Sequence, residues 1–114
     1  SVDYIASDED PYKLYDVAVI PSPARSTATF TFLQPSAPES PVDIIIDVYT
    51  VDGRKVKELS ALNVSQNDIA LQWDLRDISG SFVPDAAYVY RISVSERLTS
   101  LETMYGGVFI VQRQ

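Results

Sequence analysis

The chain has 114 residues and a formal net charge of −7, and 46% of its residues are hydrophobic. This fits one globular domain with a hydrophobic core, and the acidic balance argues against nucleic acid as a partner. Histidine and cysteine are both absent, which excludes Ser-His-Asp and Cys-His catalysis, thiol redox chemistry and the usual zinc and haem sites, so we expect no cofactor.

The N-terminal residues predict an acidic linker rather than part of the core. Asp8-Glu9-Asp10 is followed by Pro11, but a calcium loop would also need a glycine at its turn and a distal glutamate, and both are missing. We therefore expect residues 1–13 to be a linker and residues 14–114 to form the domain. Because the chain begins with Ser1, we expect a piece of a longer protein, and no apolar run is long enough to predict a membrane-spanning segment.

Short segments with the period of a β-strand follow, separated by turn residues. Residues 15–20 alternate and end at Pro21-Ser22-Pro23, where proline stops ladder pairing. Residues 26–32 alternate threonine with alanine and phenylalanine, the pattern of a half-buried strand.

The clearest pattern is a hairpin. Its first strand, residues 42–51, places Ile44, Ile46 and Val48 on one face, and Ile45, Asp47, Tyr49 and Val51 on the other. We expect Asp52-Gly53 to supply left-handed dihedrals in a tight turn before Arg54. The charged return strand, residues 54–59, suits the edge of a sheet.

Three further strands are predicted at residues 69–73, 86–94 and 106–112, the last entered through a flexible Gly-Gly. No segment has a sustained helical period. About seven strands with frequent turns predict an all-β, immunoglobulin-like antiparallel β-sandwich.

The segment QWDLRDISGSF, residues 72–82, invites two interpretations. Asp74 and Asp77 could be a carboxylate pair for hydrolysis, but a small sandwich offers no deep cleft around them. We favour a structural role, in which Trp73 fills the core, the aspartates accept backbone hydrogen bonds and Gly80 takes a positive φ. Accordingly, Trp73→Ala should cost about 3–5 kcal/mol of stability, and Asp77→Asn should change little.

Two groups of aromatic residues are predicted to differ in role. Tyr88 and Tyr90 should lie in the core, with a buried hydroxyl bonded to the backbone as in a tyrosine corner. Ile45, Tyr49 and Val51 face away from the predicted core and form a candidate docking face for a neighbouring domain or a ligand, a glycan included.

Several motifs recur in an order that resembles a known module. They are Pro21-Ser22-Pro23, Val48-Tyr49-Thr50 with Gly53-Arg54 and Val56, Trp73-Asp74 with Asp77, Gly80 and Val83, Tyr88-Val89-Tyr90-Arg91, and Val108 to Val111. Together they resemble, over about residues 15–113, the immunoglobulin-like domain named after the flagellar hook-capping protein, the FlgD-like domain. Ser22 replaces the family's asparagine, and Ala87 and Leu75 replace glycines. With Leu75 in place of the usual glycine, the motif spacing is most similar to the end domain of the sortase-like peptidase that processes type IX secretion signals in Bacteroidetes-type bacteria.

The resemblance implies no catalytic residue and no enzyme activity. It implies a C-terminal module of a larger bacterial envelope or secreted protein, located in the periplasm, on the outer-membrane surface or outside the cell. Its expected partners are domains of the parent protein or the secretion machinery. A carbohydrate-binding module and a flagellar hook-cap scaffold are the alternatives.

Overall fold

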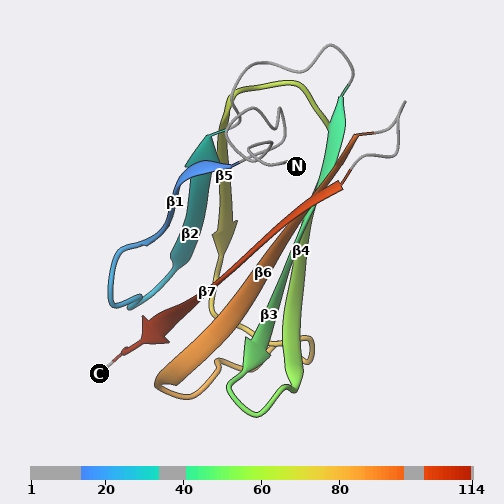
Figure 1. The fold of residues 1–114 in the computed structure, drawn as a ribbon. Helices are drawn as coiled ribbons and strands as arrows, with labels where there is room; N and C mark the ends of the chain where they lie inside the picture. Colours follow the sequence, from blue (N-terminus) through green and yellow to red (C-terminus); the bar gives the residue numbers. More distant parts are fainter. Residues whose placement is uncertain (1–13, 34–40, 97–101, 114) are drawn as a thin grey trace, which may run out of the picture.

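A computed structural model of the chain describes residues 14–33, 41–96 and 102–113, and every regular element in these ranges is a strand (Figure 1). The strands are β1 (Tyr15–Ile20), β2 (Ala28–Leu33), β3 (Val42–Thr50), β4 (Lys55–Val64), β5 (Asp68–Trp73), β6 (Ala86–Glu96) and β7 (Glu102–Val111). None of the described segments is a helix that could cross a membrane. The predicted linker at residues 1–13 lies outside the described ranges.

The strands form two antiparallel sheets that face each other. One has the order β1-β2-β5 and the other the order β4-β3-β6-β7. In constant-type immunoglobulin domains the fourth strand joins the sheet of the first two, whereas here β4 stays beside β3. The prediction of an all-β, immunoglobulin-like sandwich with seven strands is confirmed.

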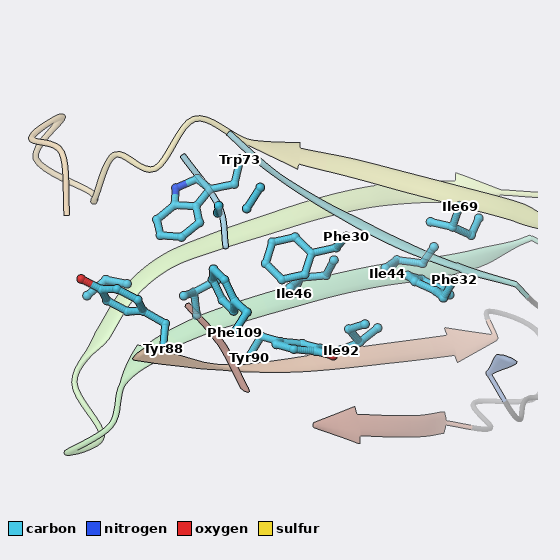
Figure 2. Close-up of a cluster of buried hydrophobic side chains, with 14 of the residues drawn as sticks. Phe30, Phe32, Ile44, Ile46, Ile69, Trp73, Tyr88, Tyr90, Ile92 and Phe109 are labelled. Atoms are coloured by element: carbon cyan, nitrogen blue, oxygen red, sulfur yellow. The ribbon is translucent and has the colours of Figure 1, made fainter. Parts of the chain in front are cut away.

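The core lies between the sheets and contains the inward side chains of strands from both (Figure 2). Ile44, Ile46 and Val48 are fully buried, as their alternation predicts. The ring of Phe30 in the smaller sheet meets Tyr90 and Phe109 of the larger sheet edge-on, at centroid distances of 5.3 and 5.5 Å. Such pairs add about 0.5–1.5 kcal/mol to the energy of burial, so these rings tie the two sheets together.

The turn between β3 and β4 differs from the sequence prediction. The Thr50 N–H donates to the Arg54 carbonyl at 2.8 Å and the Gly53 N–H to the Thr50 carbonyl at 2.9 Å, which leaves a three-residue loop. Gly53 has a φ of 98°, and Asp52 is not among the residues with positive φ. The expectation that both residues are left-handed was therefore wrong, because a three-residue hairpin needs only its last residue in that conformation.

β4 and β7 extend the furthest beyond the bounds that their patterns predict. β4 reaches Val64 rather than residue 59, because Leu59 and Ala61 still pack against the core. It does lie at a sheet edge, as its charge predicts. β7 begins at Glu102, so Gly106 and Gly107 lie in its middle and are not a flexible entry. That expectation was wrong because the glycines pair in unbroken register with Arg91 and Tyr90 of β6.

Candidate functional site

Trp73 at the end of β5 is a core residue. Its side chain is 1% exposed, and its indole N–H donates to the carbonyl of Arg76 at 2.8 Å. The ring meets Tyr88 and Phe109 edge-on at centroid distances of 6.4 and 6.2 Å. The ring is buried in the core and the indole N–H is hydrogen-bonded to the next loop. Trp73 therefore anchors that loop and does not line a site.

That loop then places Leu75 in the core in an unusual conformation. Leu75 is fully buried and has a φ of 64°, a region that costs a non-glycine residue about 1–2 kcal/mol. Its carbonyl accepts the N–H of Val83 at 2.9 Å. The positive φ accounts for the glycine that the FlgD-like pattern has at this position.

The two aspartates of the loop serve separate turns. Asp74 accepts the backbone N–H of Arg76 at 3.1 Å, and its other oxygen lies 3.9 Å from the Arg76 guanidinium. Asp77 accepts the backbone N–H groups of Ser79 and Ser81 and the Ser79 hydroxyl, at 3.0, 3.1 and 2.7 Å. The bond from the Ser79 hydroxyl is the main cause of a lowered Asp77 pKa.

Gly80 completes the same turn. Its φ is 93°, and its N–H donates to the Asp77 carbonyl at 2.9 Å, as the sequence predicts for a turn glycine. A lowered pKa suits an acceptor that stays ionised, whereas a general acid needs a raised one. Each carboxylate is thus occupied by its own turn, and the loop does not form a paired-carboxylate centre.

Tyr88 and Tyr90 of β6 are both in the core, as predicted, but their hydroxyl groups have different surroundings. The Tyr88 hydroxyl donates to the carbonyl of Pro84 at 2.6 Å, which is the hydrogen bond of a tyrosine corner. Tyr90 instead stacks on Tyr105 at 6.4 Å and lies over Gly107. Burial raises the pKa of both phenols.

The proline segment between β1 and β2 links the two sheets. Pro21 and Pro23 both follow cis peptide bonds, and Ala24 comes directly after them. The Ala24 N–H donates to the Ile110 carbonyl and the Gln112 N–H to the Ala24 carbonyl, both at 2.8 Å. The motif therefore brings the β1–β2 connection against the end of β7.

The candidate docking face contains an ionic cluster that the sequence prediction, based on Ile45, Tyr49 and Val51, did not include. Asp47 lies on β3 between Ile45 and Tyr49 and is only 7% exposed. One carboxylate oxygen is 2.9 Å from the Lys55 ammonium group and the other 3.6 Å from the Arg91 guanidinium. Hydrogen bonds to Glu58 and Asp47 raise the pKa of Lys55.

The three residues predicted for this face are not equivalent. Ile45 and Tyr49 are half-buried on the outer face of the larger sheet, whereas Val51 lies in the β3–β4 turn and is 70% exposed. The Arg91 guanidinium donates to the Tyr49 hydroxyl at 3.1 Å. The surface combines an aromatic ring with an arginine, and it is not a continuous apolar stripe.

A cluster of Phe82 with two arginines was not predicted from the sequence. Phe82 is 43% exposed, and the guanidinium carbons of Arg76 and Arg113 lie 4.0 and 3.8 Å from the centre of its ring. Asp85 accepts the N–H of Arg113 at 3.1 Å. Phe82 and Arg113 are far apart in sequence, so no local pattern could reveal the contact.

The described surface includes the two open hollows that follow. One, of about 310 Å³, lies between the β3–β4 turn and the β5–β6 loop, lined by Arg54, Lys55, Val56, Asp77, Ile78 and Ser79. The other, of about 350 Å³, lies on β2 and β5 and is lined by Asp16, Thr31, Phe32, Leu33, Asp68, Ile69 and Ala70. Within the described ranges no three acidic side chains converge as metal ligands.

Comparison with known proteins finds relatives among solved structures. No family model and no curated protein matches the sequence. The chain is similar to dimeric latent PorU from Porphyromonas gingivalis, with 26% identity over 86% of this chain and a TM-score of 0.71. It spans only 9% of the PorU chain.

The flagellar protein FlgD has the same fold. The structure from Pseudomonas aeruginosa shares 18% identity over 82% of this chain and 72% of its own, with a TM-score of 0.61. FlgD from Xanthomonas campestris shares 17% identity over 85% of this chain and 66% of its own, with a TM-score of 0.55. The resemblance predicted from the sequence is confirmed: the chain is a domain with the FlgD-like immunoglobulin-like fold, similar to a segment of PorU.

Proposed function

We propose that the chain is a non-catalytic interaction and structural domain at the C-terminus of a larger bacterial envelope or secreted protein, with a role in type IX secretion. The observation that carries the proposal is the similarity to the type IX secretion protein PorU over most of this chain. Because the chain spans only a small part of PorU, a role as one module within a larger protein fits it best. The source of PorU supports a Bacteroidetes-type bacterium as its origin.

The chemistry of the described surface supports a non-catalytic role. The conspicuous aspartates of the β5–β6 loop are hydrogen-bonded within their own turns. The hollow beside Asp77 is also lined by two basic side chains, Arg54 and Lys55. The pKa of Asp77 is lowered by its hydrogen bond from the Ser79 hydroxyl, whereas a general acid at neutral pH needs a raised pKa.

The face around Tyr49 is our candidate for contact with the parent protein or the secretion machinery. Arg91 donates a hydrogen bond to the Tyr49 hydroxyl. Asp47 forms ion pairs with both Arg91 and Lys55. Tyrosine and arginine are, with tryptophan, the residues enriched at protein interface hot spots. A ring fixed in this way can contact a partner at little further cost in side-chain entropy.

The test uses the full parent protein in its own host. Deleting residues 106–114 should abolish surface delivery or destabilise the neighbouring domain. Tyr49→Lys, on the proposed contact face, should impair delivery without unfolding the domain. Leu62→Lys replaces a residue on β4 that is 60% exposed, and it serves as the control. Normal export and stability of the deletion variant would overturn the proposal.

A glycan titration separates this function from carbohydrate binding. Adding soluble glycans to the isotope-labelled domain should leave the NMR signals of Tyr49 and Arg91 in place. Saturable shifts of both signals with one glycan class would instead favour a carbohydrate-binding module. A flagellar hook-cap role draws support only from the fold shared with FlgD, and self-assembly of the parent protein would be its signature.

A further inference from the structure

The sheets have four edge strands, and three of them carry features that discourage pairing with another chain. β4 bears Lys55, Lys57 and Glu58, and β1 is short and irregular at Asp16, which has a φ of 54°. β5 has only six residues and starts at Asp68. Short strands, charges and bulges are the usual protections of a sheet edge.

β7 lacks these protections. It has ten residues, and Glu102 is its only charged one. Its outward side chains include Met104, Val108 and Ile110, which are 54, 64 and 45% exposed. It pairs with β6 in unbroken register, so no bulge turns it away from solvent. A long, regular and apolar edge of this kind is expected to be covered.

The hydrogen bonds at Ala24 show which groups of β7 point to the open edge. The Ile110 carbonyl and the Gln112 N–H bond to Ala24 and therefore point away from β6. Backbone groups alternate in direction along a strand. The N–H and carbonyl groups of Met104, Gly106 and Val108 thus point to the same open edge, where no described residue bonds them.

Gly106 supplies a second, independent observation. A Cβ at this position would meet only the Tyr90 carbonyl oxygen, at an ordinary 3.6 Å, and its φ is not positive. The described chain thus gives no steric reason for a glycine here. A glycine inside a strand often marks the close approach of another backbone.

We propose that β7 pairs antiparallel with β7 of a second copy of the chain, with Gly106 opposite Gly106 of the partner subunit across a two-fold axis. Ala24 bonds the Ile110 carbonyl and the Gln112 N–H, so among the described residues the open groups run from Glu102 to the Ile110 N–H and have their midpoint at Gly106. Pairing centred there uses the whole free edge. The two four-stranded sheets become one continuous sheet.

This register is chemically compatible with itself. Met104 lies opposite Val108 of the partner subunit, so apolar side chains flank the axis on the outer face. Glu102 lies opposite Ile110 of the partner subunit, so the pairing opposes no like charges. The open N–H and carbonyl groups of Met104, Gly106 and Val108 all gain partners.

The first experiment measures mass and amide exchange of the domain over a range of concentrations. Analytical ultracentrifugation should show a monomer–dimer equilibrium. On dimerisation, the amides of Met104, Gly106 and Val108 should become protected, whereas those of Tyr105 and Gly107 are protected by β6 in both states. A monomer at every concentration, or a dimer in which the three amides still exchange freely, would overturn the proposal.

The second experiment uses the two-fold axis itself. Gly106→Lys and Gly106→Glu each place like charges opposite one another and should weaken their own dimers roughly fivefold or more. An equimolar mixture should associate again, because opposite charges then face each other. Gly106→Ala adds a methyl group without a charge and is the uncharged control: it should weaken the dimer less than either charged variant, because facing Cα atoms of such a pair are about 5.5 Å apart. Thermal unfolding should show that all three variants fold.

The outcomes show whether a second copy of the chain or another segment of the same chain covers the edge of β7. Equal dimerisation of the lysine, glutamate and alanine variants would refute pairing at Gly106. Protection of the three amides in a monomer would mean that another segment of the chain covers β7, and would also refute the proposal. The measurements need neither the parent protein nor secretion, so they stand apart from the function proposed above.

Discussion

The ring of Tyr90 lies directly over the backbone of Gly107 on the adjacent strand, so closely that a Cβ at Gly107 would be 2.5 Å from the tyrosine oxygen and 2.7–2.8 Å from the ring carbons. The neighbouring Gly106 points to the other face of the sheet and has room for a Cβ. Two adjacent glycines therefore have different structural roles.

Gly107→Ala should destabilise the domain by about 1–3 kcal/mol, the usual cost of overpacking a core. Gly106→Ala is the matched control and should leave stability within about 0.5 kcal/mol, the range typical of surface substitutions. Urea unfolding of both variants checks the difference. Equal effects would show that Tyr90 does not pack on Gly107 in solution.

At Leu75, the glycine variant should be more stable than the alanine variant, which is the reverse of the usual order. Both remove a buried side chain and should cost about 2–5 kcal/mol. Only glycine relieves the strain of a φ of 64°, so Leu75→Gly should be more stable than Leu75→Ala by about 1 kcal/mol. The same pair at Val83, which has no positive φ, should show the normal order, with alanine the more stable.

Trp73→Ala should cost about 3–5 kcal/mol, because a fully buried indole leaves a large cavity. Trp73→Phe tests the hydrogen bond to the Arg76 carbonyl separately from the packing. It should cost less than alanine, yet loosen the β5–β6 loop, with faster amide exchange at Ser79 and Ser81. Unchanged exchange in the phenylalanine variant would contradict an anchoring role for the indole N–H.

Tyr88→Phe should cost about 0.5–1.5 kcal/mol by removing the hydrogen bond to Pro84. The tyrosines also predict a pH dependence. Burial raises the pKa of Tyr88 and Tyr90 above the ordinary 10.0, so the unfolded chain loses these protons first. Stability should therefore fall as pH rises above about 10, and the Phe variant should show a shallower fall. A fall of equal slope in both proteins would rule out Tyr88 as a source.

Asp77 should stabilise the domain mainly as a hydrogen-bond acceptor and less through its negative charge. Asp77→Ala removes the acceptor of three hydrogen bonds and should lower the melting temperature, whereas Asp77→Asn keeps an acceptor and should change it less. Because the Asp77 pKa lies below 3.8 in the folded state, its ionised form contributes stability above that pH and loses it as pH falls further. Thermal unfolding at neutral and acidic pH measures both effects, and an asparagine variant as unstable as the alanine variant would contradict this account.

Local patterns in the sequence were enough to predict most of the fold. Alternation over two or three residues placed Ile44, Ile46 and Val48 inward, and it put Trp73 at the buried end of a strand. The turn role of Asp77 and Gly80 followed from short-range chemistry. These features depend on neighbours in sequence, so their residue types carry the information.

Contacts between distant segments could not be inferred in the same way. The three-residue turn at Gly53 and the extra length of β4 and β7 depend on how each strand pairs with its neighbour. The ionic cluster at Asp47 joins three strands, and the Arg113–Phe82 contact joins a loop to the end of the chain. Nothing local distinguishes these residues from ordinary surface residues.

The sequence by itself determined an all-β sandwich, because strand periodicity and turn residues are local properties of the chain, and the order of its motifs carried the resemblance to the FlgD-like domain. Only the tertiary structure decided that Gly107 packs against Tyr90, while Gly106 lies on an edge that no residue of the described ranges pairs with. The reason is that a glycine's role depends on which atoms from other strands lie against it, and sheet packing alone sets those neighbours.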